Sequence, residues 1–369
     1  MKNLSIIGVG RLGLCFALTL EEVGYNILGV DISHDYVNSL NNKTFLSNEN
    51  GVTDKLKKST NFSATTSLEE ATNHSDILFV VVSTPSLNSG RYDHSIIDNL
   101  IEELEGMGKC KKEKQFIVCC TTMPGYCDSI KDRLKNLNYM VSYNPEFIAQ
   151  GTILQDQKNP DIVLIGEGSR ESGDIIEEIY NNHTHNSPTY CRMTPTEAEI
   201  TKISLNCFCT TKISFANMVG DIVLKSGGNP DVVLNAIGSD SRVGNNYLKY
   251  GYGYGGPCFP RDNRALSIYA SDISCPSEIS SATDKSNSSH VVEQVKNFVK
   301  NNPDKKREHV FDSVAYKKGT DIIEESQKLK FLSLLVQEGY DITIEENNNN
   351  IINSIKMSYG EIFTFRNLT

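Results

Sequence analysis

The chain has 369 residues, of which 38% are hydrophobic and 22% charged, so it has enough apolar material for real cores and is not a disordered chain or a coiled coil. Its 36 basic and 46 acidic residues give a net charge of −10, which argues against nucleic acid as a partner. The ten cysteines show neither a C-x-x-C pair nor zinc-site spacing, so we expect reduced thiols, no disulfide framework and no bound metal.

The sequence shows no apolar run close to the roughly 18–20 residues that a membrane span needs. The N-terminus leads straight into a short apolar run, without the basic region and cleavage site of a secretory signal. We therefore expect a soluble, cytoplasmic protein with no membrane partner.

The first 194 residues alternate between strand and helix patterns. Apolar runs of strand length occur at residues 4–9, 26–30, 77–82, 116–120 and 162–165, and stretches with helical spacing, such as 12–23, lie between them. This alternation predicts an α/β fold with a Rossmann-type parallel sheet that helices cover on both faces.

A long helix is expected to follow. Thr194 precedes Pro195 at the first helical position, and Glu197 completes a capping-box pattern. Apolar residues then recur near the helical period up to Val223, and the Gly-Gly-Asn-Pro segment 227–230 ends the pattern. Such a helix of about 30 residues would be about 45 Å long. A shorter helix should follow at 231–237, which makes the middle domain helical.

The C-terminal part shows the α/β pattern again. After a polar stretch at 287–304, an apolar run at 310–316, a helical pattern at 328–338 and a strand pattern at 341–344 predict a β-α-β arrangement. It is too short for a complete second nucleotide-binding sheet, and the asparagine-rich segment 347–350 is expected to be a loop tip. The expected domains are residues 1–194, 195–300 and 301–369.

Residues 8–13 match the G-x-G-x-x-G fingerprint of dinucleotide-binding sites and stand between a strand pattern and a helix pattern. The glycines permit a tight turn and the approach of a pyrophosphate, to which the helix N-terminus offers free N–H groups. Asp31 ends the second strand, where a carboxylate accepts a ribose 2′-hydroxyl and repels a 2′-phosphate, so NAD is favoured over NADP. The candidate cofactor residues are Gly8, Val9, Gly10, Arg11, Leu12, Gly13 and Asp31.

Four glycines in the segment 251–256 stand just before Cys258. Such a loop loses much backbone entropy and adds nothing to a core, but it lets the backbone approach a ligand and present one thiol. Arg261 would favour the thiolate, and Asp262 could act as a base or orient one. Cys258 is therefore the candidate nucleophile, whereas a lone buried cysteine is usually inert packing.

Several motifs together resemble those of the UDP-glucose/GDP-mannose dehydrogenase family, over nearly the whole chain. Besides the fingerprint, the long helix and the cysteine loop (251–262), the chain has V-x-T-P at 82–85, N-P-E-F at 144–147 and E-x-x-K-x-x-x-N at 199–206. Its Cys-Thr-Thr-Met-Pro at 120–124 resembles the family's K-S-T-x-P, and its Tyr-Lys-Lys-Gly-Thr-Asp at 316–321, with Glu325-Ser326, resembles F-K-x-x-T-D…E-S. The resemblance is nearest to the members that oxidise UDP-glucose. It implies an NAD-binding domain, a helical dimerisation domain and a short UDP-sugar-binding domain.

The resemblance implies that two NAD⁺ oxidise the C6 hydroxyl of UDP-glucose to UDP-glucuronate through a cysteine thioester that water then cleaves. Lys202 and Asn206 share a helix face and would stabilise oxygen anions. Glu146 and Thr122 would handle the hydrolytic water, and Asp262 would assist as base. The implied catalytic residues are Cys258, Lys202, Asn206, Asp262, Glu146 and Thr122.

The resemblance also assigns binding residues. Those for the cofactor, beyond the fingerprint and Asp31, are Val82, Thr84, Pro85, Thr121, Thr122, Gln150 and Arg261. Those for the substrate are Glu146, Phe147, Lys202, Asn206, Arg242, Tyr250, Gly255, Cys258, Phe259 and Lys317. Departures from the family pattern occur on the cofactor side, at Tyr36, Cys120, Gln150, Arg261 and Glu324.

Other functions stay open. The same chemistry could act on GDP-mannose or a UDP-N-acetylhexosamine. A β-hydroxyacid-type dehydrogenase would explain neither Cys258 nor the third domain, and a non-catalytic binder of NAD or a nucleotide sugar would not need the chemical residues that are present. The long apolar helix predicts a homodimer, with Ile213, Phe215, Met218 and Ile222 as candidates for the interface or the core.

Overall fold

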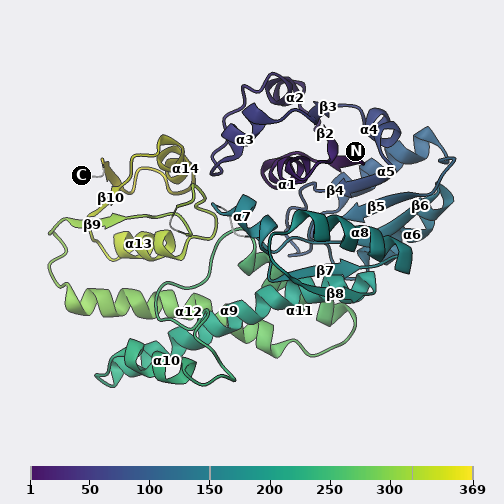
Figure 1. The fold of residues 1–369 in the computed structure, drawn as a ribbon. Coiled ribbons are helices and arrows are strands. Elements are labelled where there is room, and N and C mark those ends of the chain that lie inside the picture. Colours follow the sequence, from purple (N-terminus) through teal and green to yellow (C-terminus); the bar gives the residue numbers. More distant parts are fainter. Residues whose placement is uncertain (1, 149–150, 318, 368–369) are drawn as a thin grey trace. The chain divides into compact units, whose positions relative to one another are not determined.

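The computed structural model describes residues 2–148, 151–317 and 319–367. The chain forms two compact units, Met1–Lys202 and Ile203–Thr369, and each has a sheet of its own (Figure 1). The helix α9 (Pro195–Lys225) begins in the first unit and continues into the second.

Within the described part of the first unit, eight strands form one sheet in the order β3-β2-β1-β4-β5-β6-β7-β8 (Figure 1). Neighbouring strands are parallel, except that β6 and β7 meet in an antiparallel pair. The strands are β1 (Asn3–Ile7), β2 (Asn26–Val30), β3 (Phe62–Thr65), β4 (Ile77–Val80), β5 (Lys114–Val118), β6 (Tyr139–Tyr143), β7 (Ile162–Gly166) and β8 (Thr189–Met193).

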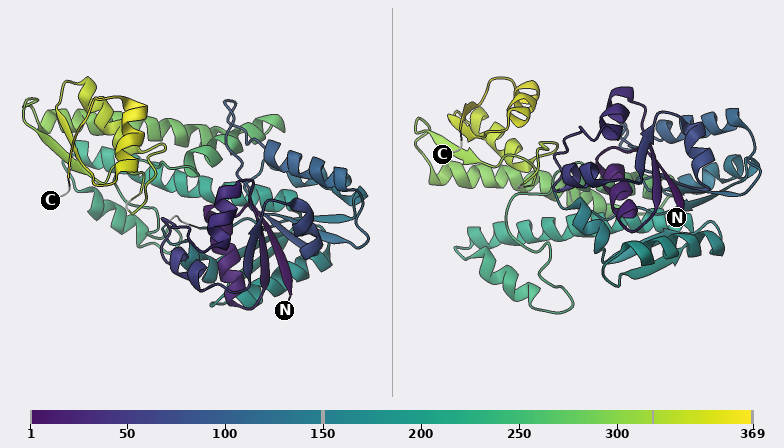
Figure 2. Two further views of the ribbon diagram at one scale, coloured as in Figure 1. Left: turned by 90° about the horizontal axis from the view of Figure 1, so that it is seen from above. Right: turned by 45° about the horizontal axis from the view of Figure 1, so that its top comes forward.

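Helices cover both faces of this sheet, and the views in Figure 2 show them on either side of the strands. One buried cluster joins the sheet to α1, α2, α3, α7 and α8, and a second joins it to α4, α5, α6 and the start of α9. The helices are α1 (Arg11–Glu22), α2 (His34–Asn41), α3 (Val52–Lys58), α4 (Leu68–His74), α5 (Ser95–Met107), α6 (Tyr126–Asn136), α7 (Ile153–Lys158) and α8 (Arg170–His183).

The second unit combines helices with a small sheet. After α9 come α10 (Pro230–Gly238), α11 (Phe259–Asp272) and α12 (Glu278–Asn301). The described strands β9 (His309–Asp312), β10 (Ile342–Glu345) and β11 (Thr364–Arg366) form a parallel sheet in the order β11-β10-β9. It packs with α12, α13 (Gln327–Gln337) and α14 (Asn349–Tyr359) around one apolar core.

The start of α9 is fixed by the predicted capping box. The backbone N–H of Thr194 donates to Glu197 Oε2 at 2.8 Å, and the N–H of Glu197 donates to Thr194 Oγ1 at 3.4 Å. The predicted long helix is confirmed at 31 residues.

Among the described residues, α9 is the one helix that is long and apolar enough to cross a membrane by length and composition, so the expectation that the chain has no such segment is wrong. However, 39% of its most apolar window is buried inside the structure. Its buried Ser214 donates to the carbonyl of Thr283 at 3.2 Å, and the buried Asn217 accepts from the N–H of Gly251 at 3.0 Å. These hydrogen bonds tie α9 to other segments of the second unit, and one helix of this length and composition is weak evidence for a membrane span.

The predicted α/β class with a Rossmann-like sheet, a long central helix and a small C-terminal α/β domain is confirmed. The expected loop tip at 347–350 is wrong, because α14 begins at Asn349. The oxygen of the Asn348 side chain accepts from the N–H of Asn350 at 2.9 Å and caps this helix.

Candidate active site

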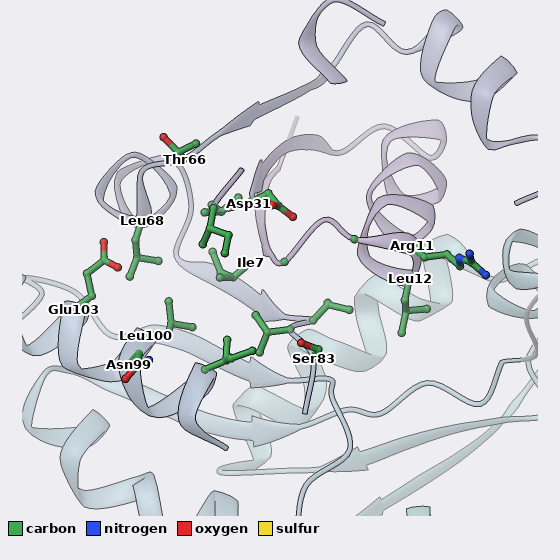
Figure 3. Close-up of a pocket in the computed structure, with 17 residues that line it drawn as sticks. Ile7, Arg11, Leu12, Asp31, Thr66, Leu68, Ser83, Asn99, Leu100 and Glu103 are labelled. Carbon is green, nitrogen blue, oxygen red and sulfur yellow. The ribbon is translucent and has the colours of Figure 1, made fainter. Parts of the chain in front are cut away.

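The first unit contains a cavity of about 690 Å³ at the carboxyl ends of β1, β2 and β4 (Figure 3). At this point the strand order turns from β2-β1 to β4, and open α/β sheets bind nucleotides at such a switch point. The cavity is lined by Ile7, Gly8, Gly10, Arg11, Leu12, Val30, Asp31, Ile32, Thr66, Leu68, Val81, Val82, Ser83, Ile96, Asn99, Leu100 and Glu103.

The three fingerprint positions favour glycine for different structural reasons. Gly8 has φ +92°, and a Cβ there would lie 2.7 Å from the carbonyl oxygen of Val81. A Cβ on Gly13 would lie 2.0 Å from the carbonyl oxygen of Gly8, so the turn and the packing of α1 on the sheet both require glycine. A Cβ on Gly10 would meet nothing within 4 Å, so the space beside it is open to a ligand. The N-terminus of α1 lies at this turn, and its free N–H groups and the positive end of the helix dipole would stabilise a bound anion.

Asp31 lines the cavity directly after β2 and lies between Arg11 and Glu103 in Figure 3. Its Oδ1 accepts from the N–H of Ser33 at 3.1 Å, which orients the carboxylate. At the position of a family arginine, the hydroxyl of Tyr36 donates to the carbonyl of Val9 at 2.8 Å. Burial raises the pKa of the Tyr36 phenol, so this position carries a neutral group that braces the fingerprint turn.

Of the other predicted cofactor residues, Val82 lines the cavity and Pro85 is exposed. The Thr84 hydroxyl donates to the carbonyl of Thr121 at 2.7 Å and ties together the segments that follow β4 and β5. Gln150 lies outside the described residues.

Three predicted residues meet near the start of α9. Lys202, only 8% exposed, donates from Nζ to the carbonyl oxygen of Glu146 at 2.5 Å, and it lies 4.3 Å from the centre of the Phe147 ring. The carboxylate of Glu146 accepts from the Tyr180 hydroxyl at 2.8 Å. Burial raises the pKa of the Glu146 carboxyl, and the hydrogen bond from Tyr180 and the charge of Lys202 oppose the shift.

The Thr122 side chain is completely buried and donates to Glu199 Oε1 at 2.8 Å. Glu199, also completely buried, accepts in addition from the N–H groups of Gly125 at 2.6 Å and Cys127 at 3.0 Å. Burial raises the pKa of the Glu199 carboxyl, and these hydrogen bonds oppose the shift. Because the Thr122 proton is directed to Glu199, the Thr122 oxygen is left as an acceptor.

In the second unit, Cys258 is exposed and occupies the N-cap position of α11, and none of the ten cysteines forms a disulfide in the described chain. A helix N-terminus stabilises a thiolate, and Arg261 follows one turn later. The Asn206 side chain donates to Asp262 Oδ2 at 2.6 Å, and Arg261 Nε lies 3.7 Å from Asp262 Oδ1. Asp262 is 1% exposed, so its carboxylate is held by fixed partners four residues after the thiol.

The glycines before Cys258 are required by close neighbours. A Cβ on Gly255 would lie 2.2 Å from the carbonyl oxygen of Glu325. Gly256 has φ +81°, and a Cβ there would lie 2.4 Å from the ring of Tyr316. The N–H of Gly256 donates to the carbonyl of Glu324 at 3.1 Å. The cysteine loop thus packs on Tyr316, Glu324 and Glu325, so two of the motifs that resemble those of the family meet in the second unit.

The other residues that were predicted to bind the substrate belong to the second unit, where some are exposed and others contact neighbouring side chains. Arg242 is 87% exposed and binds both carboxylate oxygens of Asp240, at 3.0 and 2.8 Å. The Tyr250 hydroxyl donates to Asp221 at 3.0 Å. Phe259 lies edge-on to the Tyr247 ring, 6.0 Å between centres, and Lys317 is exposed.

Sequence reasoning missed part of the cavity lining. Asn99, Leu100 and Glu103 come from α5, and Thr66 comes from the segment before α4. No motif marks these positions, and only the strand order brings α5 beside the fingerprint. Glu199 was part of a quoted motif, but nothing in the sequence assigned it to Thr122.

A dinucleotide cavity on a Rossmann-like sheet, joined by a long helix to a unit with an exposed cysteine in a glycine loop, defines an NAD-dependent oxidoreductase. The NAD-binding domain of the UDP-glucose/GDP-mannose dehydrogenase family matches residues 2–184, and the family's central domain matches 196–289. The chain belongs to this family of NAD-dependent nucleotide-sugar dehydrogenases.

Similar proteins cover most of the chain. The GDP-mannose 6-dehydrogenase of Pseudomonas aeruginosa is 28% identical over 94% of this chain and 81% of its own length. The UDP-glucose 6-dehydrogenase of Rickettsia felis is 27% identical over 91% of this chain and 76% of its own length. A solved UDP-glucose dehydrogenase from the archaeon Pyrobaculum islandicum has a TM-score of 0.89 at 25% identity, over 100% of this chain and 86% of that one.

Proposed function

We propose that the protein oxidises the C6 hydroxyl of UDP-glucose to the carboxylate of UDP-glucuronate, through a thioester on Cys258. The observation that carries this proposal is the setting of the thiol: exposed, at the N-terminus of a 14-residue helix, and at the end of a glycine loop that side chains hold in place. An inert packing cysteine needs none of these features.

NAD fits the first unit. The turn at Gly8 and the open space beside Gly10 suit a pyrophosphate, and Asp31 suits a ribose hydroxyl. When bound, NAD⁺ supplies the hydride acceptor for each of the two oxidations. The residues proposed to hold it are the fingerprint, Asp31, Val82, Thr84, Pro85, Thr121, Thr122, Gln150 and Arg261.

The protein residues handle the substrate atoms. The first oxidation removes a hydride from C6 and a proton from the hydroxyl, which leaves an aldehyde. The Cys258 thiolate adds to this aldehyde and gives a hemithioacetal alkoxide, and loss of a second hydride from its C6 gives the thioester. Water then replaces the sulfur, which gives the carboxylate and the thiolate and releases two protons.

Each residue has a proposed role in this sequence. Lys202 and Asn206 donate to the oxygen anions; the bond from Asn206 to Asp262 uses one amide hydrogen and leaves the second for an oxyanion. Asp262 assists as base. Glu146, whose pKa is raised, takes the proton of the hydrolytic water, and the Thr122 oxygen orients that water.

GDP-mannose is a second candidate substrate. Proteins named GDP-mannose 6-dehydrogenase are 27–28% identical to this chain, so the same chemistry on GDP-mannose is the alternative, together with UDP-N-acetylhexosamines. The test is NADH formation with UDP-glucose, UDP-N-acetylglucosamine, UDP-N-acetylmannosamine and GDP-mannose. Two NADH per UDP-glucose are expected. One NADH per sugar would overturn the thioester mechanism, and no NADH with any of the four would favour a non-catalytic binder.

We further propose a cytoplasmic homodimer that forms through α9. Phe208, Phe215 and Ile222 lie seven residues apart on one helix face and are 67%, 45% and 57% exposed. Met218 is exposed as well, whereas Ile213 is half-buried. Light scattering should give a dimer mass for the wild type and a monomer mass for Phe215→Glu. A wild-type monomer at micromolar concentration would contradict the dimer.

A further inference from the structure

The backbone of the cysteine loop is held by side chains from two helices. The N–H of Gly251 donates to Asn217 of α9 at 3.0 Å. The side chain of Asn287 on α12 accepts from the N–H of Tyr254 at 2.9 Å and donates to the carbonyl of Tyr254 at 3.0 Å. The loop therefore obtains from side chains the partners that a strand or helix would obtain from neighbouring backbone.

His290 on α12 supplies a further contact, and its geometry defines its charge. Its Nδ1 lies 2.7 Å from Asp221 Oδ2, and its Nε2 lies 2.8 Å from the carbonyl oxygen of Gly251. A carboxylate and a carbonyl can only accept, so both ring nitrogens must donate, and only the doubly protonated imidazolium does this. The side chain of His290 is 3% exposed, which strengthens both interactions.

The groups around His290 suit a cation. The Tyr250 hydroxyl donates to the second oxygen of Asp221 at 3.0 Å, and the Tyr250 ring stands edge-on to His290 at 5.5 Å. From α12, the neutral Gln294 also donates to Gly251 O, at 3.0 Å. Lys225, one helical turn after Asp221 on α9, and Glu293, three residues after His290 on α12, form an ion pair with each other.

We propose that His290, paired with Asp221, is a positioning residue for the nucleophile: as a cation it holds the Gly251 carbonyl and so fixes the loop that presents Cys258. This rests on the proposed function of Cys258. Further along, the loop is held at Tyr254 by Asn287 and at Gly256 by Glu324. Without His290, Gly251 would keep its bonds to Asn217 and Gln294, so the N-terminal end of the loop is expected to be held less firmly but not released.

The charge state is tested without any activity. Nitrogen NMR of the full chain with labelled histidine should show, at pH 7, a doubly protonated ring that disappears in His290→Gln. If the signal lost in that variant is a neutral ring, the proposal is overturned. Hydrogen exchange of the peptide that contains residues 251–258 should be about tenfold faster in His290→Gln, because one charge-assisted hydrogen bond is lost. An unchanged exchange rate also overturns it.

The positioning role is tested by the kinetics of sugar-acid formation. The wild type should exceed His290→Gln in kcat about tenfold near pH 7, with KM for NAD⁺ unchanged. An unchanged kcat, or a fall in kcat that comes with an equally large change in KM for NAD⁺, would reduce His290 to a structural residue. His185→Gln, at an exposed histidine, is the control and should match the wild type.

Two further outcomes keep the proposals separate. If His290→Gln does not fold, Asp221→Asn keeps the histidine and removes its anion, and kcat should fall with KM for NAD⁺ unchanged; an unchanged kcat overturns the proposal. If no sugar acid forms with any protein, the proposed function fails, while the NMR and exchange results still decide whether His290 is the cation that holds the loop.

Discussion

Cys258 stands at the N-terminal end of α11, where the helix dipole and the nearby guanidinium of Arg261 both favour a negatively charged sulfur. Replacing it by serine should stop acid formation, because a serine hydroxyl is a poor nucleophile in this setting. We expect the rate of sugar-acid formation to fall by at least about a thousandfold. Mass spectrometry of the product checks this, and a trapped aldehyde adduct or slow first oxidation is compatible with it.

The chain offers a matched control for that variant. Cys275 is also exposed and follows the end of the same helix. Cys275→Ser should keep the wild-type rate. If Cys258→Ser makes acid as fast as Cys275→Ser does, Cys258 is not the nucleophile.

Asp31 lines the cavity and should decide between the two dinucleotides. A hydrogen bond from a ribose hydroxyl to a charged group contributes about 1.5–3 kcal/mol, so Asp31→Ala should raise KM for NAD⁺ by about 10- to 100-fold. It should also raise the relative activity with NADP⁺, because the repulsion of a 2′-phosphate is removed. Steady-state kinetics with both cofactors measure this. Asp35→Ala, at an exposed aspartate nearby, serves as the reference, and equal use of both cofactors by the wild type would contradict the role of Asp31.

Individual residues could be predicted where a motif links the residue type to the backbone conformation at that position. Gly8 and Gly13 are such cases, because a turn and a close packing contact each exclude a side chain. Glu199 and His290 could not be predicted, because their significance lies in partners 77 and 39 residues away. Pairings over such distances arise from the fold alone. The individual site roles stay predictions that the proposed variants test.

At the scale of elements, the helices and strands that have a clear cap or a clear apolar pattern could be predicted from the sequence. The capping box and the helical period predict the start of α9 at Pro195, and the strand predicted at 26–30 coincides with β2. β8 (Thr189–Met193) was missed, because this strand at the sheet edge is half-exposed and its sequence TYCRM shows no apolar run. The start of α14 was missed because asparagines read as a loop, although asparagine is also a good helix cap.

The helix α8 ends at a histidine that should make stability depend on pH. His183 is completely buried beside Phe16 and Tyr180, and neither ring nitrogen has a hydrogen-bond partner among the described residues. Burial lowers the pKa of His183 to about 4. Since the unfolded chain takes up this proton near pH 6.5 and the folded chain does not, folding stability is lost as pH falls from about 6.5 to 4, by up to ~3 kcal/mol.

Denaturant unfolding at pH 7 and pH 5 measures this dependence. His183→Phe removes the titrating group and should reduce the loss of stability between these pH values by about 2 kcal/mol, whatever the change in absolute stability. His185→Gln, at an exposed histidine two residues on, should keep the wild-type dependence. If the loss of stability between pH 7 and pH 5 is the same in all three proteins, His183 takes up its proton in the folded chain as readily as in the unfolded chain, which would contradict this prediction.

At the scale of the whole molecule, the proposed dimer gives Arg242 its role. Arg242 is 87% exposed and its guanidinium is held by Asp240, on a loop whose carbonyls at Val243 and Gly244 accept from Lys212 of α9 at 3.0 and 3.3 Å. A fixed, outward-facing guanidinium suits recognition of sugar hydroxyls or a carboxylate. We therefore propose that Arg242 reaches the sugar bound in the neighbouring subunit.

Arg242→Ala should therefore raise KM for the nucleotide sugar by about tenfold or more, the loss of one charge-assisted contact, and leave KM for NAD⁺ nearly unchanged. If the arginine acts across the dimer, each Arg242→Ala subunit keeps an intact Cys258, and each Cys258→Ser subunit keeps an intact Arg242. Mixing the two variants under conditions that exchange subunits, and assaying at a sugar concentration far below the KM of Arg242→Ala, then gives one complete site in each heterodimer. Activity should recover toward half of the wild-type value per heterodimer. Without recovery and without the change in KM, Arg242 is a surface residue held by Asp240, and each chain works with its own side chains alone.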